Sequence, residues 1–184
     1  MNKKYTAPQT QKRSFKSFLF WGVLIAITIF FIIFIIFRFV NARSVNSYDS
    51  LTQVQGEELF LKEAQTETYL VFVYSSSEEE ANEDDEFDKL VYKYITFAKK
   101  NKDKTSVYNI YGFDVDKPEN HRVLITDTGE QKAVISDVET LDDLLIYYKD
   151  VPVLLVVSGN IITDYKDSDN AISDYLQSII DANK

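Results

Sequence analysis

One segment of the chain is uncharged and almost entirely apolar. Phe18 to Phe37 is a run of twenty residues without a charge. At about 1.5 Å per residue, a helix of this length spans about 30 Å, the thickness of the hydrocarbon core of a bilayer. Because lipid offers no hydrogen-bond partner to the backbone, a single spanning segment must be helical. The pattern predicts one transmembrane helix, within residues 18–40.

The charges beside this segment predict its direction. Five Lys and Arg side chains precede it in a tail of residues 1–17, whereas only Arg38 and Arg43 follow it closely. The positive-inside rule then places the N-terminus in the cytoplasm and the rest of the chain outside a plasma membrane. A cleaved signal peptide is the alternative, with a small-residue site at Val40-Asn41-Ala42. The apolar run is longer than the usual 7–15 residues of a signal peptide, which favours a retained single-pass anchor.

The remainder divides into a polar tether, 41–56, and one domain, 57–184. Continuous apolar runs predict buried strands at Tyr69–Tyr74 and Val107–Val115. Val153–Val157 and Ile161–Tyr165 flank a Ser-Gly-Asn turn, which is typical of a β-hairpin. Short strands are expected at Val123–Ile125 and Ala133–Ile135, joined by a turn at 127–130.

Apolar side chains at helical spacing predict four helices in this domain. A short one covers Gly56–Glu67, and a long one includes Phe87–Ala98. A third begins at Thr140, with Asp143 as its capping-box partner. The last covers Ala171–Ile180, capped by Asp169 or Asn170. The order of elements predicts an α/β domain with a mixed sheet flanked by helices.

Composition narrows the chemistry. The chain has no cysteine, so it can form neither a disulfide nor a thiolate, and one histidine, His121, excludes a multi-histidine metal site within one chain. Six of the 20 basic side chains lie in residues 1–40, so residues 41–184 carry 14 basic and all 29 acidic groups, a net charge of −15. Such a domain repels nucleic acid, and no nucleic-acid partner is expected.

Three local sequences resemble the thioredoxin-like family. They are YLVFVYS (69–75) followed by a long helix, YGFDVD (111–116), and VPVLLVVSGNII (151–162). The last is similar to the family's cis-proline, strand, glycine turn and strand. The resemblance covers roughly residues 57–182 and implies a thioredoxin-like fold.

The resemblance also implies where a redox motif would lie. It places Glu78 and Ala81 at the two positions that cysteines occupy in the family. The thiolate is the working group of thiol–disulfide exchange, and neither side chain can replace it. We therefore expect no thiol–disulfide oxidoreductase activity, no other enzyme activity and no cofactor.

A second family feature remains available. By resemblance, Pro152 is cis and faces the loop of the former redox motif, where neighbouring backbone can pair with an extended peptide. The candidate peptide-binding loop therefore consists of Ser76, Ser77, Val151 and Pro152. The alternative is a turn proline that serves only the fold.

Acidic residues crowd the start of the long helix. We expect no metal site. The alternative is a site for a hard cation such as Ca²⁺ in one acidic patch, which consists of Glu83, Asp84, Glu86 and Asp88. The patch could also contact a basic partner, or simply favour the helix N-terminus through the helix dipole.

These observations predict a membrane-anchored, redox-inactive, thioredoxin-like binding or scaffold protein outside the plasma membrane. Its partner would be a protein or a peptide. One such partner would be an exported or envelope protein that it assists. The alternatives are a cation-dependent module or enzyme that uses the acidic patch, and a structural subunit of a membrane complex.

Overall fold

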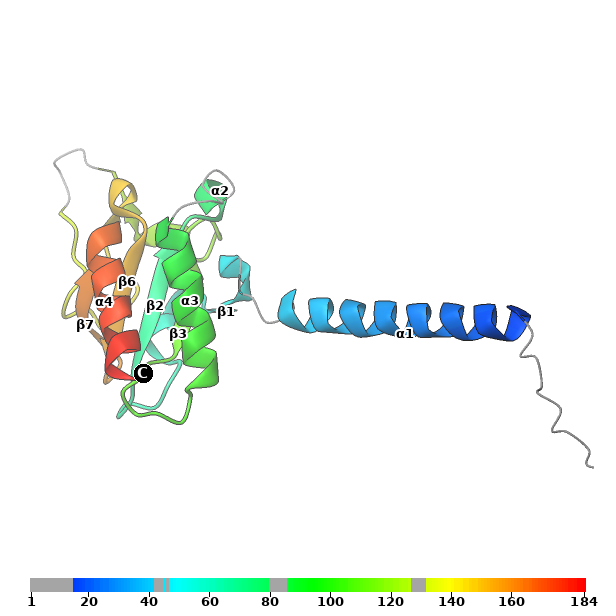
Figure 1. Ribbon diagram of the computed structural model, residues 1–184. Helices are drawn as coiled ribbons and strands as arrows, with labels where there is room; N and C mark the ends of the chain where they lie inside the picture. The colour runs from blue at the N-terminus through cyan, green and yellow to red at the C-terminus, as the bar shows by residue number, and fades with distance from the viewer. Residues whose placement is uncertain (1–14, 42–44, 46, 80–85, 127–131) are drawn as a thin grey trace, which may run out of the picture. The chain divides into compact units, whose positions relative to one another are not determined.

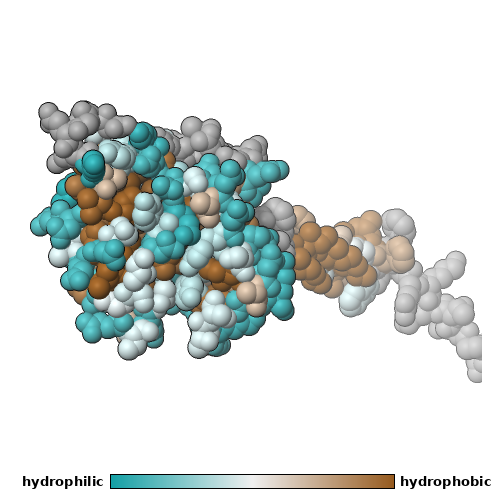
Figure 2. Space-filling model, turned by 90° about the vertical axis from the view of Figure 1, so that its left-hand side faces the viewer, coloured by the Kyte–Doolittle hydropathy of each residue, from teal (hydrophilic) through white to brown (hydrophobic). Residues whose placement is uncertain are grey.

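The computed structural model describes residues 15–41, 45, 47–79, 86–126 and 132–184, in two compact units that divide between residues 43 and 44. The first unit contains helix α1 (Phe15–Asn41). Its Phe18–Ile36 segment is long and apolar enough to cross a membrane. The large apolar side chains of this segment are exposed, and Figure 2 shows the apolar surface along the helix. That this helix spans a membrane, its direction and the identity of the membrane stay predictions.

A five-stranded mixed sheet forms the centre of the second unit (Figure 1). Its strands, in the order of the sheet, are β1 (Thr52–Gln53), β3 (Ile110–Asp114), β2 (Thr68–Tyr74), β6 (Val153–Ser158) and β7 (Ile161–Lys166). β1, β3 and β2 run parallel, whereas β6 is antiparallel to β2 and β7 is antiparallel to β6. The predicted buried strands and the β-hairpin are confirmed, and so is the thioredoxin-like α/β fold class.

Helices α3 (Glu86–Lys100) and α4 (Asp169–Ala182) pack on one face of this sheet. Figure 1 shows them side by side in front of the strands. Leu70 and Phe72 of β2 point toward these helices, and Tyr69 and Val71 point to the other face. All four side chains are buried because β2 is the central strand.

Irregular segments cover the opposite face. They include a two-stranded parallel ribbon of β4 (Leu124–Ile125) and β5 (Ile146–Tyr147). The described residues of this unit also form four 3₁₀ turns: η1 (Tyr48–Ser50), η2 (Gly56–Phe60), η3 (His121–Val123) and η4 (Tyr148–Asp150). A one-turn helix, α2 (Ser76–Glu79), follows β2.

The helix predicted from Thr140 was wrong. Thr140 does donate a hydrogen bond to Asp143 Oδ2 (2.7 Å), but within a turn that leads into β5. Leu145 bridges to Val134, and Ile146 pairs with Leu124. The spacing of a short apolar run does not distinguish a helix from a strand. Here the pairing with Leu124 and Val134 selected the extended conformation.

Three smaller predictions also need correction. The helix expected at Gly56–Glu67 is only the 3₁₀ turn η2. Ser168, and not Asp169 or Asn170, caps α4, because its hydroxyl accepts a hydrogen bond from the Ala171 N–H. The second strand begins at Ile110 rather than Val107.

The two short strands expected around residues 127–130 do not pair with each other. Leu124–Ile125 pairs with β5, and Val134 forms an isolated bridge to Leu145. The turn itself lies outside the described residues. The predicted tether, 41–56, contains packed residues, since Tyr48, Leu51 and Val54 are buried. The boundary between tether and domain stays a prediction.

Candidate functional site

Three consecutive serines follow the central strand, directly before Glu78, the first of the two positions that the resemblance gives to a redox motif. Ser75 is buried, Ser76 begins α2 and Ser77 is exposed. Asp116 Oδ2 accepts hydrogen bonds from Ser75 Oγ at 2.9 Å and from Ser76 Oγ at 3.3 Å. The same oxygen accepts from the Ser77 backbone N–H at 2.9 Å. One carboxylate therefore holds the whole loop and caps the N-terminus of α2.

A second carboxylate, that of Asp114, accepts hydrogen bonds from the backbone of the serine loop and of Asp116. Asp114 is 2% exposed and ends β3, directly beside Tyr74 at the end of β2. Its Oδ1 accepts from the Ser76 N–H (3.3 Å) and the Asp116 N–H (3.1 Å). Lys117 Nζ lies 3.4 Å from its Oδ2. The charge of Asp114 is thus compensated, as a buried carboxylate requires.

Asn120 connects this end of the sheet to the segment before β2. It is fully buried, and its Nδ2 donates to the backbone oxygen of Asp114 at 2.9 Å. Its Oδ1 accepts from the Gly56 N–H at 2.9 Å. Asp114, Asp116 and Asn120 were not among the sequence candidates. The sequence signal for the first two was the pair of acids that ends YGFDVD.

The predicted peptide-binding residues come together at this end of the sheet. The Val151–Pro152 bond is cis, as the resemblance implied. Val153 pairs with Val73, so Pro152 lies beside the carboxyl end of β2, from which Ser76 and Ser77 continue. Val151, Pro152 and Ser76 are half-buried. Binding of a peptide by these residues stays a prediction.

The remaining candidates are only partly described. The backbone of Glu78 belongs to α2, but its side chain lies outside the described residues, as do Ala81, Glu83 and Asp84. Glu86 is exposed, whereas Asp88 is buried and accepts a hydrogen bond from the Tyr48 hydroxyl. Within the described ranges, no group of three or more acidic or histidine side chains could hold a metal ion. The cation hypothesis therefore stays untested.

The arrangement of the serines does not favour nucleophilic catalysis. Their hydroxyls donate to Asp116, a carboxylate whose low pKa makes it a weak general base. His121 is exposed, and its Nδ1 lies 3.3 Å from the backbone oxygen of Val115. The geometry supports a loop closed by hydrogen bonds.

The hydrogen bonds to Asp116 make a pH-dependent contribution to stability. Partial burial raises the pKa of this carboxyl, but hydrogen bonds from the Ser77 N–H and from the three serine hydroxyls outweigh it. The net pKa lies below its ordinary value of 3.8. Since the pKa is lowered in the folded state, the stabilisation is present above the unfolded-state pKa and is lost as pH falls through the folded-state pKa.

We expect Asp116→Asn to lower the melting temperature at pH 7, because the amide loses the charge that attracts four donors. The difference from the wild type should shrink as pH falls below about 3.8, the ordinary pKa that the carboxyl keeps in the unfolded chain, and through the lower pKa of the folded protein. Melting curves of both proteins between pH 7 and pH 2.5 measure this. A difference that stays constant over that range would contradict the role given to Asp116.

No model of a known protein family matches the sequence, and no curated protein matches it either. Solved structures similar to this chain include two at low sequence identity. One comes from a study of the structural basis of the thiol resolving mechanism in yeast mitochondrial 1-Cys peroxiredoxin via glutathione/thioredoxin systems. At 12% identity it covers 72% of this chain and 98% of its own, with a TM-score of 0.38.

The other is the oxidised form of mitochondrial thioredoxin 3 from Saccharomyces cerevisiae. It is 11% identical, covers 71% of this chain and 97% of its own, and has a TM-score of 0.38. The order and register of the strands place this domain in the thioredoxin-like fold class, and the sequence lacks every cysteine that thiol chemistry requires.

Proposed function

We propose that this protein is a membrane-tethered, redox-inactive, thioredoxin-like module that holds a protein or peptide partner at the outer face of the plasma membrane. One observation carries the proposal. The loop after β2, next to the positions that the resemblance gives to a redox motif, is closed by serine hydrogen bonds to Asp116, and the chain contains no cysteine. Without a thiolate, this end of the sheet can bind but cannot exchange disulfides.

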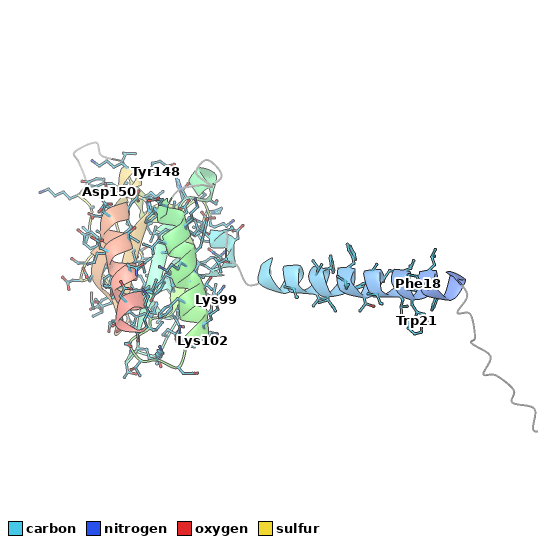
Figure 3. The ribbon with its side chains drawn as sticks, viewed as in Figure 1. Phe18, Trp21, Lys99, Lys102, Tyr148 and Asp150 are labelled. Carbon is cyan, nitrogen blue, oxygen red and sulfur yellow. The ribbon has the colours of Figure 1, made fainter. Side chains whose placement is uncertain are left out.

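One exposed aromatic side chain lies on the segment that leads to Pro152 and supports the proposal of a binding surface. Tyr148 is 45% exposed and begins η4, the turn that leads to Pro152. Figure 3 shows Tyr148 and Asp150 at the same end of the domain as α2. Tyrosine is enriched in protein interfaces because its ring provides apolar area and its hydroxyl a hydrogen bond. The net charge of −15 favours a basic partner.

The proposed location is supported by the first unit. The Phe18–Ile36 segment has the length and apolarity of a membrane span. The excess of positive charge before it supports a cytoplasmic N-terminus and an outer domain. A domain anchored in this way meets its partner at a raised local concentration, so weak contacts suffice.

Single-cysteine variants test the proposal. The natural chain has no thiol, so a maleimide can label this protein only at the introduced cysteine. We expect Ser77→Cys to react, in intact cells, with a membrane-impermeant maleimide that carries a photo-crosslinker. After illumination it should form a defined adduct with one partner protein. Ser178→Cys is the matched control, since Ser178 is also an exposed serine but lies on α4.

Two results would count against the proposal. Labelling of Ser77→Cys only after the membrane is permeabilised would contradict the outer location. Adducts that are absent, or identical for the two positions, would contradict a partner site at the serine loop.

A further inference from the structure

A pocket of about 180 Å³ lies at the opposite end of β3 from the serine loop. Ile95, Ala98 and Ile110 are buried and provide apolar walls. Its polar lining residues are Thr52, Lys99, Lys102, Asn109 and Tyr111. At about 30 Å³ per molecule of liquid water, this space equals about six waters, enough for a group of a few heavy atoms.

The charges around this pocket differ from those of the domain. Lys99 and Lys102 line it, and none of its lining residues is acidic, although the domain carries a net charge of −15. Figure 3 shows both lysines at the C-terminal end of α3. Among the described residues, neither forms an ion pair with a carboxylate, and Lys102 has no hydrogen bond either.

One of the two ammonium groups is held in place. Lys99 Nζ donates to the backbone oxygen of Ser50 at 2.9 Å, which uses one of its three N–H groups. Glu63 lies outside the lining, and its Oε1 accepts hydrogen bonds from Asn109 Nδ2 and the Tyr111 hydroxyl. Its carboxylate thereby positions two lining residues.

Lysines at the end of a helix also have a simpler explanation, since they stabilise its negative C-terminal dipole. That explanation applies equally to Lys100, which is exposed at the same end of α3 but does not line the pocket. It does not account for the apolar walls or for the exclusion of carboxylates from the lining. Lys100 is therefore the control that separates the two explanations.

We propose that this pocket binds a small oxyanion, a phosphate or carboxylate group attached to a short apolar part. The free N–H groups of Lys99 and Lys102 supply charge-assisted hydrogen bonds, and the Thr52 hydroxyl adds a donor. The apolar part of the ligand contacts Ile95 and Ile110. The ligand is either a free solute or the headgroup of an anionic phospholipid. The membrane in which the protein is proposed to be anchored would supply such a lipid.

Calorimetric titration of the full chain in maltoside micelles tests this. The probes are inorganic phosphate, butyrate and dihexanoyl-phosphatidylglycerol below its micellar concentration, each at constant ionic strength. We expect saturable binding of at least one probe. It should weaken about tenfold in Lys99→Gln/Lys102→Gln, because two charge-assisted contacts are lost, and should be unchanged in Lys100→Gln. Tighter binding of the lipid than of phosphate and butyrate would identify the headgroup as the source.

The single variant Lys102→Gln keeps the test valid if the double variant is unstable, because Lys102 contacts no described residue through a hydrogen bond or ion pair. Absence of saturable binding for all three probes would overturn the proposal. So would an equal loss of affinity in Lys100→Gln, which would show a general charge effect. Neither result bears on partner binding at the serine loop.

Discussion

Replacing Phe72 by alanine is expected to lower the free energy of unfolding of the domain by about 3–5 kcal/mol. Phe72 lies in the central strand and is fully buried. Its ring centroid lies 4.8 Å from that of Tyr48, 6.0 Å from that of Tyr74 and 6.2 Å from that of Phe87. Removing the ring leaves a cavity among rings from three segments that cannot all move inward.

Urea unfolding of the full chain in detergent, followed by circular dichroism, measures this loss. Leu61→Ala is the control, because Leu61 is equally apolar but 67% exposed, and its loss should change stability by less than about 0.5 kcal/mol. A cost below about 1 kcal/mol for Phe72→Ala would show that the aromatic cluster is not a packed core.

Asn120→Ala should be the second most damaging of these substitutions, at about 2–4 kcal/mol. The amide satisfies two backbone groups, the Gly56 N–H and the Asp114 C=O, each at 2.9 Å. Alanine leaves the part-buried Gly56 N–H without this partner, which costs about 1–3 kcal/mol. The Asp114 C=O keeps only the longer hydrogen bond from the Lys117 N–H at 3.3 Å, so the loss of its Asn120 donor adds to that cost. Because this C=O belongs to the residue that supports the serine loop, the loss should also increase hydrogen exchange at Ser76 and Ser77.

Asn101→Ala is the matched control for this change. Asn101 follows α3 and makes one side-chain hydrogen bond, to the Phe97 backbone oxygen at 2.9 Å. Its loss should cost about 0.5–1.5 kcal/mol and should leave exchange at the serine loop unchanged. Equal costs at the two positions would argue against a special role for Asn120.

The strands of this domain were predictable where the local sequence was compatible with a strand and not with a helix. Tyr69–Tyr74 is apolar throughout and became the buried central strand. The segment from Thr140 left two choices, because Leu141 and Leu144 suit either a helix face or a buried turn. Pairing with β4 and with Val134 then selected the extended form, and those partners lie 22 and 11 residues away in the chain.

The candidate site was predictable only in part. The resemblance indicated Ser76, Ser77, Val151 and Pro152, and the sheet does bring them to one end. It did not indicate that Asp116 holds the serines, because these contacts join residues about 40 positions apart. They arise from the parallel register of β2 on β3, which no local pattern encodes.

Two properties follow from the sequence by itself. The chain cannot perform thiol chemistry, and one segment is apolar enough to span a membrane, because both depend only on which residues are present and in what order. Only the tertiary structure decided that a carboxylate closes the serine loop and that two lysines share a pocket without an acid. Both arrangements depend on strand register and on the packing of α3 against the sheet, which bring together groups that are distant in the chain.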